Sequence, residues 1–315
     1  MKKRTIAIAW IINAYQKPNQ IIHTIHTISD ENDSIWLHYD KKSPISELDF
    51  LRDHFKNDSR VHFAQKYSIA WGGFEIVLAD VLLAKMLLKS NTKFDYVIHF
   101  TGTTYPIQPL VRLREYLTTH YGKSFINLDP NEAIHEEGSQ RSQHFAKEHF
   151  GVYPGRNIPK YKWFKSMLFR VNLKFLRFLS LINVLKTKTY LPSAFPKIYR
   201  GFVHNVIFKD HYVTALTHKK SNLFLKQLKY ISCADEVFFN TLLTNLTPKD
   251  ELVRTNNLLV TYWRKGTASP DNINESDIED LRSQSDRFFA RKFESMSMLE
   301  LVDSDLLNRK NEQRN

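Results

Sequence analysis

The chain has 315 residues, of which 42% are hydrophobic and 25% are charged, an ordinary globular balance that excludes a disordered protein. A chain of this length can bury one large core or two modest ones. The formal net charge is +12, and residues 141–190 carry +10 of it, with eleven Lys and Arg against one acidic residue. Because the excess is local, it predicts a local anionic partner and no general affinity for nucleic acid.

Alternation of short apolar runs with amphipathic stretches characterises the first half. The apolar runs predict buried strands at residues 5–12, 34–40, 60–64, 94–100 and 124–129. The spacing between them predicts helices over residues 18–29, 46–56, 73–90 and 108–119. Strands alternating with helices predict a mostly parallel sheet covered on both faces. Ligands of such sheets bind at the carboxyl ends of strands, and polar clusters follow the strands at residues 13–20, 38–43 and 101–106.

A change of pattern follows residue 129, because residues 130–160 are polar and irregular. Residues 161–186 then predict a helix with one apolar stripe and an adjoining basic face. Two interpretations are open: a helix packed on the core, or an interfacial helix lying on an anionic membrane surface, which the charge concentration favours. The stripe is Phe164, Leu168, Val171, Phe175, Phe178, Ile182 and Leu185, and the basic face is Arg170, Lys174 and Arg177.

The last third predicts a mixture of strands and helices. Residues 198–208 resemble a strand, residues 210–229 a helix, and a further helix begins near Asp235. The apolar run 256–263 and the basic-aromatic run 287–293 precede a helix over 297–307, and residues 308–315 are expected to fray. No internal repeat or low-complexity linker divides the chain, so we expect one catalytic unit.

The single cysteine, Cys233, allows no disulfide within the chain, so nothing indicates an oxidising compartment. The basic N-terminus followed by the apolar run Ile6–Ile12 resembles a signal peptide, but the run is short and no small-residue cleavage site follows. No stretch approaches the ~20 apolar residues that a membrane span needs. We therefore predict a cytoplasmic protein.

Common phosphate-binding and metal-binding motifs are missing: there is no Gly-rich phosphate loop and no His/Cys metal spacing. The only strict D-x-D run is Asp303–Ser304–Asp305, inside the predicted C-terminal helix, where a solvated face explains it better than a metal site. Asp129, after a predicted strand, is a looser metal-ligand candidate. Without a metal, a departing nucleotide diphosphate needs cationic side chains. Arg287, Arg291 and Lys292 offer them, although surface charge explains these residues as well.

Two adjacent acids, Asp235 and Glu236, open an amphipathic helix after a small-residue turn. Acids in a first helical turn ordinarily complement the helix dipole. The alternative is that one carboxylate is a general base that deprotonates an acceptor hydroxyl. Spacing alone leaves both interpretations open.

These clusters, in this order, resemble the core-2/I-branching β-1,6-N-acetylglucosaminyltransferase and peptide O-xylosyltransferase family. The correspondence runs from about Ile6 to Phe293. "AYQKPNQI" is similar to the family's opening strand-to-helix segment, "IWLHYDKKS" to its "HVDKKS" element, and "ADEVFFNTLL" to its "PDE-x-x-x-x-T" segment. "AWGGFEIVLADVLLAKMLL" with "FDYVIHFTGTTYPIQPLVRLREYL" is similar to its longest ungapped stretch, and "FARKF" to its terminal basic motif.

The resemblance implies a GT-A type α/β fold, a UDP-sugar donor and inversion without a divalent metal or other cofactor. It implies that Glu236 is the catalytic base, that Asp235 orients it, and that Lys292 binds the pyrophosphate. The expected domain spans residues 1–307. Within it, residues 1–130 bind the nucleotide-sugar, 131–196 form a basic insertion and 197–307 bind the acceptor. Further donor contacts are expected from Ala14, Tyr15, Asp40, Trp71, Thr104 and Arg264, and acceptor contacts from His204, Asn205 and Trp263.

Departures from the family's pattern concern substrate binding. Thr104 stands where the family usually has Asp, which alters part of the donor pocket. His204 and Asn205 stand where aromatic residues are usual. Before the last helix, members commonly have a second basic residue, and this chain has Asp271 there. Arg264 or Lys265 is expected to supply the missing positive charge. The animal enzymes have a membrane anchor and disulfides, whereas this chain resembles a bacterial member.

The function expected from the residues and the resemblance is transfer of a GlcNAc-like or xylose-like sugar from a UDP-sugar to a glycan or lipid-linked glycan, in bacterial surface polysaccharide or lipopolysaccharide synthesis. Residues 161–186 are expected to contact the membrane. Two alternatives are a metal-dependent GT-A transferase that uses Asp129 and a non-catalytic protein that binds membranes or polyanions.

Overall fold

A seven-stranded sheet forms the centre of the computed structural model, which describes residues 5–128, 192–230, 233–264 and 269–307. Its strand order is β3-β2-β1-β4-β7-β6-β8. Strands β1 to β4 are parallel, β7 is antiparallel to β4 and β6, and β6 is parallel to β8. The predicted mostly parallel α/β sheet is therefore confirmed. The strands are β1 (Ile8–Ala14), β2 (Ser34–Tyr39), β3 (Val61–Ala64), β4 (Tyr96–Thr101), β6 (Ser124–Phe125), β7 (Val206–Phe208) and β8 (Leu252–Val253).

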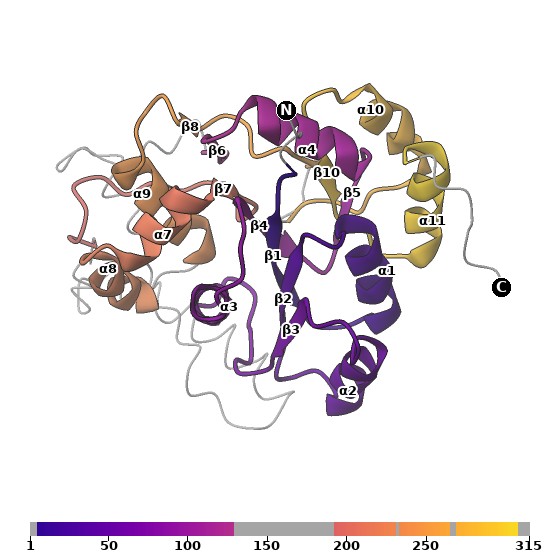
Figure 1. The fold of residues 1–315 in the computed structure, drawn as a ribbon, viewed down its shortest axis with the longest axis horizontal. Coiled ribbons are helices and arrows are strands. Elements are labelled where there is room, and N and C mark those ends of the chain that lie inside the picture. Colours follow the sequence, from indigo (N-terminus) through magenta and orange to yellow (C-terminus); the bar gives the residue numbers. More distant parts are fainter. Residues whose placement is uncertain (1–4, 129–191, 231–232, 265–268, 308–315) are drawn as a thin grey trace, which may run out of the picture.

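Helices cover both faces of this sheet (Figure 1). Alternate residues of a strand point to opposite faces, so Trp10 packs in the core with α1 while Ile11 packs in the core with α3. One face carries α1 (Pro18–Ile28), α2 (Ile45–His54) and α4 (Leu110–Thr119). The other carries α3 (Glu75–Lys89), α7 (Lys209–Thr217), α8 (Ser221–Gln227) and α9 (Asp235–Leu246).

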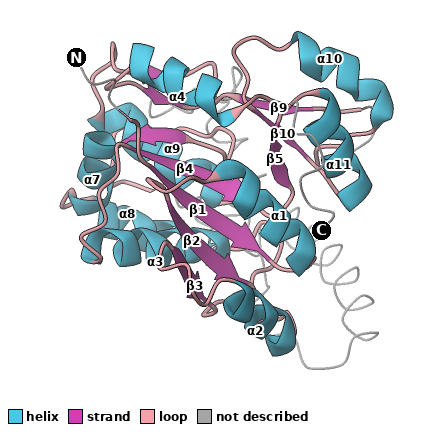
Figure 2. Ribbon diagram, turned by 45° about the vertical axis from the view of Figure 1, so that its right-hand side comes forward, coloured by secondary structure: helices cyan, strands magenta, loops and turns pink. Residues whose placement is uncertain are grey.

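A second, three-stranded sheet has the order β5-β10-β9 and lies beside the last two helices (Figure 2). Strand β10 is antiparallel to β5 and parallel to β9. A third apolar cluster holds this sheet against α10 and α11. The elements are β5 (Thr104–Pro106), β9 (Leu259–Thr261), β10 (Phe289–Arg291), α10 (Ile278–Ser283) and α11 (Met296–Asp305), with short 3₁₀ turns at Leu228–Tyr230 and Glu275–Asp277.

Several boundaries differ from the sequence-based expectations. The single helix expected over 210–229 is two helices, α7 and α8, and the strand expected over 198–208 is only the three residues of β7. Asp303 was expected on a solvated face, which is wrong: it is buried and accepts hydrogen bonds from Tyr105 Oη (2.8 Å) and His23 Nε2 (2.7 Å). The predicted helix over 161–186 and Asp129 lie outside the described residues.

None of the helices within the described ranges combines the length and the apolar character needed to cross a membrane.

A buried ion pair between Asp33 and Arg114 lies at the amino ends of the parallel strands of the central sheet. The Asp33 carboxylate has no exposed surface and accepts hydrogen bonds from Ile8 N (2.9 Å) and Arg114 Nη2 (2.6 Å). Burial raises the pKa of Asp33, and the Arg114 charge opposes that rise. Arg114, on α4, also donates to Ile6 O. One guanidinium thus joins α4 to the start of β1 and to the turn before β2.

Replacing Arg114 with Met should leave Asp33 buried without its cation. Removing one partner of a buried pair typically costs 3–5 kcal/mol, so we expect the free energy of unfolding in urea to fall by about 3 kcal/mol. Arg282→Met is the matched control, because Arg282 pairs with the largely exposed Glu279 on α10 and such pairs contribute about 0–1 kcal/mol. Equal effects of the two substitutions would contradict the assignment of Arg114 as a buried clamp.

Candidate active site

The carboxyl ends of β1, β2 and β4 meet at one edge of the central sheet. Ala14 pairs with Tyr39, and Asn13 pairs with Thr101. Asp40, directly after β2, donates its N–H to Ala14 O (2.8 Å). In a parallel sheet covered by helices, this edge is where ligands bind.

Asp40 organises the loops at this edge. It is buried, and its carboxylate accepts the N–H groups of Lys42 (2.8 Å) and Ile69 (3.2 Å). The carboxylate thereby ties the loop after β2 to the loop between β3 and α3. The predicted contact between Asp40 and the nucleoside stays a prediction, and these bonds show that Asp40 also shapes the loops.

Three aromatic residues that were singled out from the sequence are more than half exposed: Tyr15 at 53%, Trp71 at 73% and Trp263 at 52%. They come from the loops after β1, before α3 and after β9. An exposed aromatic ring offers a face on which a nucleobase or a sugar ring can pack. Their placement is compatible with the predicted donor and acceptor contacts.

Glu236 lies in the first turn of α9, and 28% of its side-chain surface is exposed. Its Oε2 accepts a hydrogen bond from Arg200 Nε, and its main-chain oxygen accepts from Gly201 N (2.9 Å) and Asn240 Nδ2 (2.8 Å). A Cβ on Gly201 would lie 2.4 Å from Asn127 O and 3.0 Å from the Asn240 side chain. Only glycine therefore lets this segment approach α9 closely enough to deliver Arg200 to Glu236.

Asp235 points into the protein beside Glu236. Its Oδ1 is buried and has no hydrogen-bond partner within the described ranges. Burial, with the Glu236 charge adding to it, raises the pKa of Asp235 to about 7. The nearby Arg291 charge opposes this shift. The two adjacent acids therefore differ: Glu236 is half-buried and ion-paired, whereas Asp235 is buried and readily protonated.

Arg291 ends β10, where it pairs in register with Thr104 of β5 and Thr261 of β9. Burial lowers the pKa of its guanidinium, while Asp235, Glu236 and Tyr15 act in the opposite direction. Its Nε is buried without a partner in the part of the chain that is described. The sequence analysis named Arg287, Arg291 and Lys292 as candidate cations for a diphosphate. In the structure it is Arg291 that acts on Asp235 and Glu236.

Lys292 follows Arg291 directly. Burial, and then the Arg291 charge, lower the pKa of Lys292, whose Nζ donates to Ser269 Oγ (3.2 Å). The next residue, Phe293, is held by its main-chain oxygen, which accepts from Gln20 Nε2 (2.9 Å) on α1. Two adjacent cations with lowered pKa values form a site where an anion would be favoured.

Thr104, at the position where the family usually has Asp, is buried. Its hydroxyl bonds with Thr101 Oγ1 (2.8 Å). Across the sheet it faces Arg291 in register. The prediction that this part of the donor pocket is altered stays a prediction.

A buried aspartate that the sequence analysis missed also belongs to this site. Asp80, on α3, accepts a hydrogen bond from Asn13 Nδ2 (2.6 Å) at the end of β1. Burial, and then the Asp235 charge, raise the pKa of Asp80 to about 8. The available signal was a single acidic residue on the inner face of an otherwise apolar helix.

His204 and Asn205 were expected to contact the acceptor, but both are buried at 3% and 0% exposure. Burial lowers the pKa of His204 to about 3, so its ring is neutral, and it packs on Phe100 and Phe289. Neither side chain reaches the surface, because both residues directly precede β7, an interior strand between β4 and β6. Their placement corresponds to a polar layer beneath the site and does not support direct acceptor contact.

Arg264 was expected at the donor, and its contacts do not support that expectation. Its Nη2 donates to both carboxylate oxygens of Asp277 (2.8 and 2.9 Å), and its N–H donates to Asp271. The guanidinium is thus engaged in holding the turn before α10. Lys265, the alternative, lies outside the described residues.

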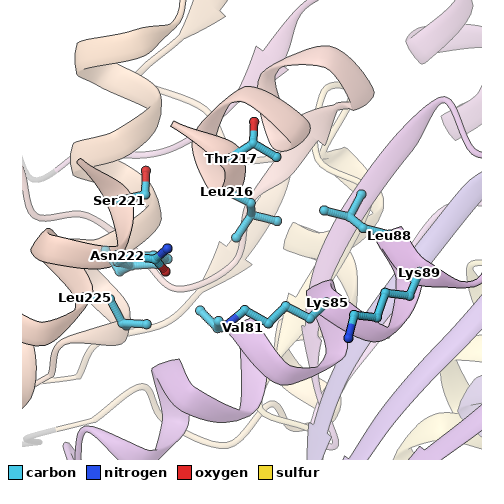
Figure 3. A pocket seen from close by; sticks show the side chains of 10 residues that line it. Val81, Lys85, Leu88, Lys89, Leu216, Thr217, Ser221, Asn222 and Leu225 are labelled. Carbon is cyan, nitrogen blue, oxygen red and sulfur yellow. The ribbon is translucent and has the colours of Figure 1, made fainter. Parts of the chain in front are cut away.

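A hollow of about 200 Å³ lies between α3, α7 and α8 (Figure 3). Leu88, Leu216 and Leu225 give it an apolar lining, and the stems of Lys85 and Lys89 border it. None of its lining residues belongs to the site around Glu236.

Within the ranges that the structure describes, no three His, Cys, Asp or Glu side chains are grouped so that they could hold a metal ion.

Comparisons with known proteins relate the chain to one family. The model of the family described as "Core-2/I-Branching enzyme" matches residues 8–285. The xylosyltransferase oxt of Drosophila melanogaster is 24% identical over 73% of this chain and 25% of its own length. A probable β-1,3-galactosyl-O-glycosyl-glycoprotein β-1,6-N-acetylglucosaminyltransferase 7 of Homo sapiens is 20% identical over 44% of this chain and 32% of its own length. The chain therefore spans about a quarter to a third of these relatives.

Gly201 offers a test of how Arg200 is delivered to Glu236. Gly201→Ala would force a Cβ against a main-chain oxygen and a hydrogen-bonded amide, neither of which can move cheaply. Overpacking of this kind costs about 1–3 kcal/mol, so we expect the free energy of unfolding to fall by that amount in urea titrations. A Gly201→Ala protein as stable as wild type would show that the segment does not pack on α9 as described.

Proposed function

The chain belongs to the core-2/I-branching enzyme family of glycosyltransferases, and we propose that it transfers a sugar from a UDP-sugar to a glycan hydroxyl with inversion and without a divalent metal. In this proposal Glu236 is the catalytic base, and Arg291 with Lys292 stabilises the departing diphosphate. The observation that carries it is the meeting of the partly exposed Glu236 carboxylate with Arg291, which Lys292 follows directly in the chain.

The base step needs a carboxylate that is ionised, reachable and fixed in direction. Glu236 meets these needs because Arg200 engages Oε2 and leaves Oε1 as the oxygen that takes the proton. The acceptor hydroxyl gives its proton to Oε1 while its oxygen attacks the anomeric carbon. The bond between that carbon and the diphosphate oxygen breaks on the opposite side, which inverts the configuration. Such general-base assistance typically contributes about 10²–10⁴-fold in rate.

The leaving diphosphate takes the bonding electron pair, so its negative charge grows during the reaction. The Arg291 and Lys292 cations are partly buried, and their lowered pKa values indicate that their charges are incompletely compensated. A diphosphate would supply the missing charge through hydrogen bonds that are stronger than neutral ones. These cations take the place that a metal ion holds in metal-dependent transferases.

The substrates follow from the relatives and from the exposed rings. The two relatives' names refer to transfer of xylose and N-acetylglucosamine, and we propose a donor of this kind. Tyr15 and Trp71 flank the edge where Asp40 organises the loops, and their exposed faces suit a base or a sugar ring. Trp263 is proposed for the acceptor. The metal-dependent rival that uses Asp129 makes the opposite prediction about chelators.

Substituting Glu236 with Gln would remove the base and keep the side-chain volume. We expect turnover to fall about 100-fold or more, while the Kd for UDP and the melting temperature change little. Glu279→Gln is the matched control: Glu279 also lies in the first turn of a helix and pairs with an arginine, so a helix-dipole role would affect both variants alike. Retained turnover in Glu236→Gln would refute the assignment.

Metal independence predicts that EDTA leaves the rate unchanged. In the same scheme Lys292→Ala should weaken UDP binding by about 1.5–3 kcal/mol, which is roughly a 10- to 150-fold higher Kd by calorimetry. Lys56→Ala serves as the control, because Lys56 is exposed and pairs only locally with Asp53. Strong inhibition by EDTA that Mn²⁺ reverses would favour the metal-dependent alternative.

A further inference from the structure

Asp80 occupies an unusual position for an ionisable residue. Along β1, alternate residues Ala9, Ile11 and Asn13 face α3, and the first two pack in its apolar cluster. Asn13 ends this row and donates Nδ2 to Asp80 Oδ1 (2.6 Å). Only 9% of Asp80 is exposed. The carboxyl group thus sits between the helix and the sheet, on the inner side of the proposed base.

Buried polar atoms without hydrogen-bond partners surround Asp80 in the described part of the chain. They include Asn13 Oδ1, which can only accept, Asp235 Oδ1, which accepts whenever that carboxyl is ionised, and the Tyr212 hydroxyl, which can donate or accept. An ionised Asp80 would add acceptors to this group, and the Asn13 and Asp235 oxygens would still lack a donor. A protonated Asp80 supplies an O–H donor where acceptors lack one, which removes part of the cost of burying them.

The charges near Asp80 also favour its protonated form. The titratable groups that face it are Asp235 with Glu236 behind it on α9, Tyr212 on α7 and His99 on β4 beside Tyr212. His99 is neutral, because burial lowers its pKa to about 3. Arg291 acts on Asp235 and Glu236, and no described cation is among the groups that act on Asp80. Two buried carboxylates that repel each other favour keeping one proton, and burial, with the Asp235 charge adding to it, raises the pKa of Asp80.

We propose that Asp80 is a positioning residue that works as a neutral carboxylic acid, fixing the end of β1 through Asn13 and supporting Asp235 beneath Glu236. The inference deepens the proposed function, on which it rests. Asp80 touches no substrate. Its neutral state lets Asp235 carry the negative charge that Arg291 faces, whereas a full negative charge on Asp80 would pull Asp235 toward protonation and disturb the base.

The kinetic test compares Asp80→Asn with Asp80→Ala. Asn keeps a neutral donor and acceptor of the same shape, so it should retain at least about a third of wild-type kcat, whereas Ala should lose about tenfold or more, with little change in KM for the donor. Wild-type kcat should also fall above about pH 8 as Asp80 ionises, and Asp80→Asn should lack this fall. Asp303→Asn is the matched control, an equally buried aspartate on α11 that should keep the wild-type pH profile.

An infrared measurement decides the protonation state without any activity assay. At pH 7 the wild-type protein should show protonated-carboxyl C=O absorption that disappears toward pH 9, loses one component in Asp80→Asn and persists unchanged in Asp303→Asn. The melting temperature of Asp80→Asn relative to wild type should rise from pH 5 to pH 8. The reason is that a group with a raised folded-state pKa loses its contribution to stability as pH increases toward that value.

Each outcome bears on a different claim. If Asp80→Asn is as inactive as Asp80→Ala and the infrared band is unaltered, Asp80 acts as an anion and the inference is wrong. Full activity of both variants would overturn the positioning role. If wild-type protein shows the band and its loss in Asp80→Asn but transfers no sugar, the proposed function fails while the neutral state of Asp80 stands.

Discussion

Ionisable side chains are buried where the two sheets meet, and the rest of the structure depends on how their loss of hydration is offset. Asp80, Asp235 and Arg291 come from α3, α9 and β10, and each loses most of its hydration there. Burying such groups is favourable only when they compensate one another. Since the three residues are 56 or more positions apart along the chain, balancing the Arg291 cation against the two acids requires both sheets and the helices between them to be in place. The site and the fold are therefore stabilised together.

The surrounding hydrogen bonds explain how this junction is kept rigid. Gln20 on α1 holds Phe293 after the two cations, and Gly201 N donates to the main-chain oxygen of Glu236. Asp40 joins the loops at the strand ends. Each of these bonds connects an element of one layer to an element of another, so the carboxylates and cations cannot move independently. A preorganised site of this kind needs little reorganisation when charge develops in a transition state.

The spacing of apolar residues predicted the helices and strands that are long enough to show a helical or an alternating pattern. The helices α1 to α4 and the parallel strands of the first half were expected almost at their observed bounds. Strands β5, β9 and β10 have three residues each, too few for an alternating pattern, and the second sheet was therefore missed. Predictions about single residues were incomplete or wrong for a related reason. Asp80 lies within a helix that reads as apolar, and whether an arginine such as Arg264 faces a ligand or Asp277 depends on contacts far along the chain.

Thr104 shows how one departure can change the balance of charge at this junction. An aspartate at this position would face Arg291 from β5 and share its guanidinium with the acids of α9. Here the Thr104 hydroxyl bonds instead with Thr101 Oγ1, and the described acids that act on Arg291 are Asp235 and Glu236 of α9. The guanidinium is less compensated as a result. A cation in that state has more to gain from a diphosphate, which is the charge that the proposed reaction sets free beside it.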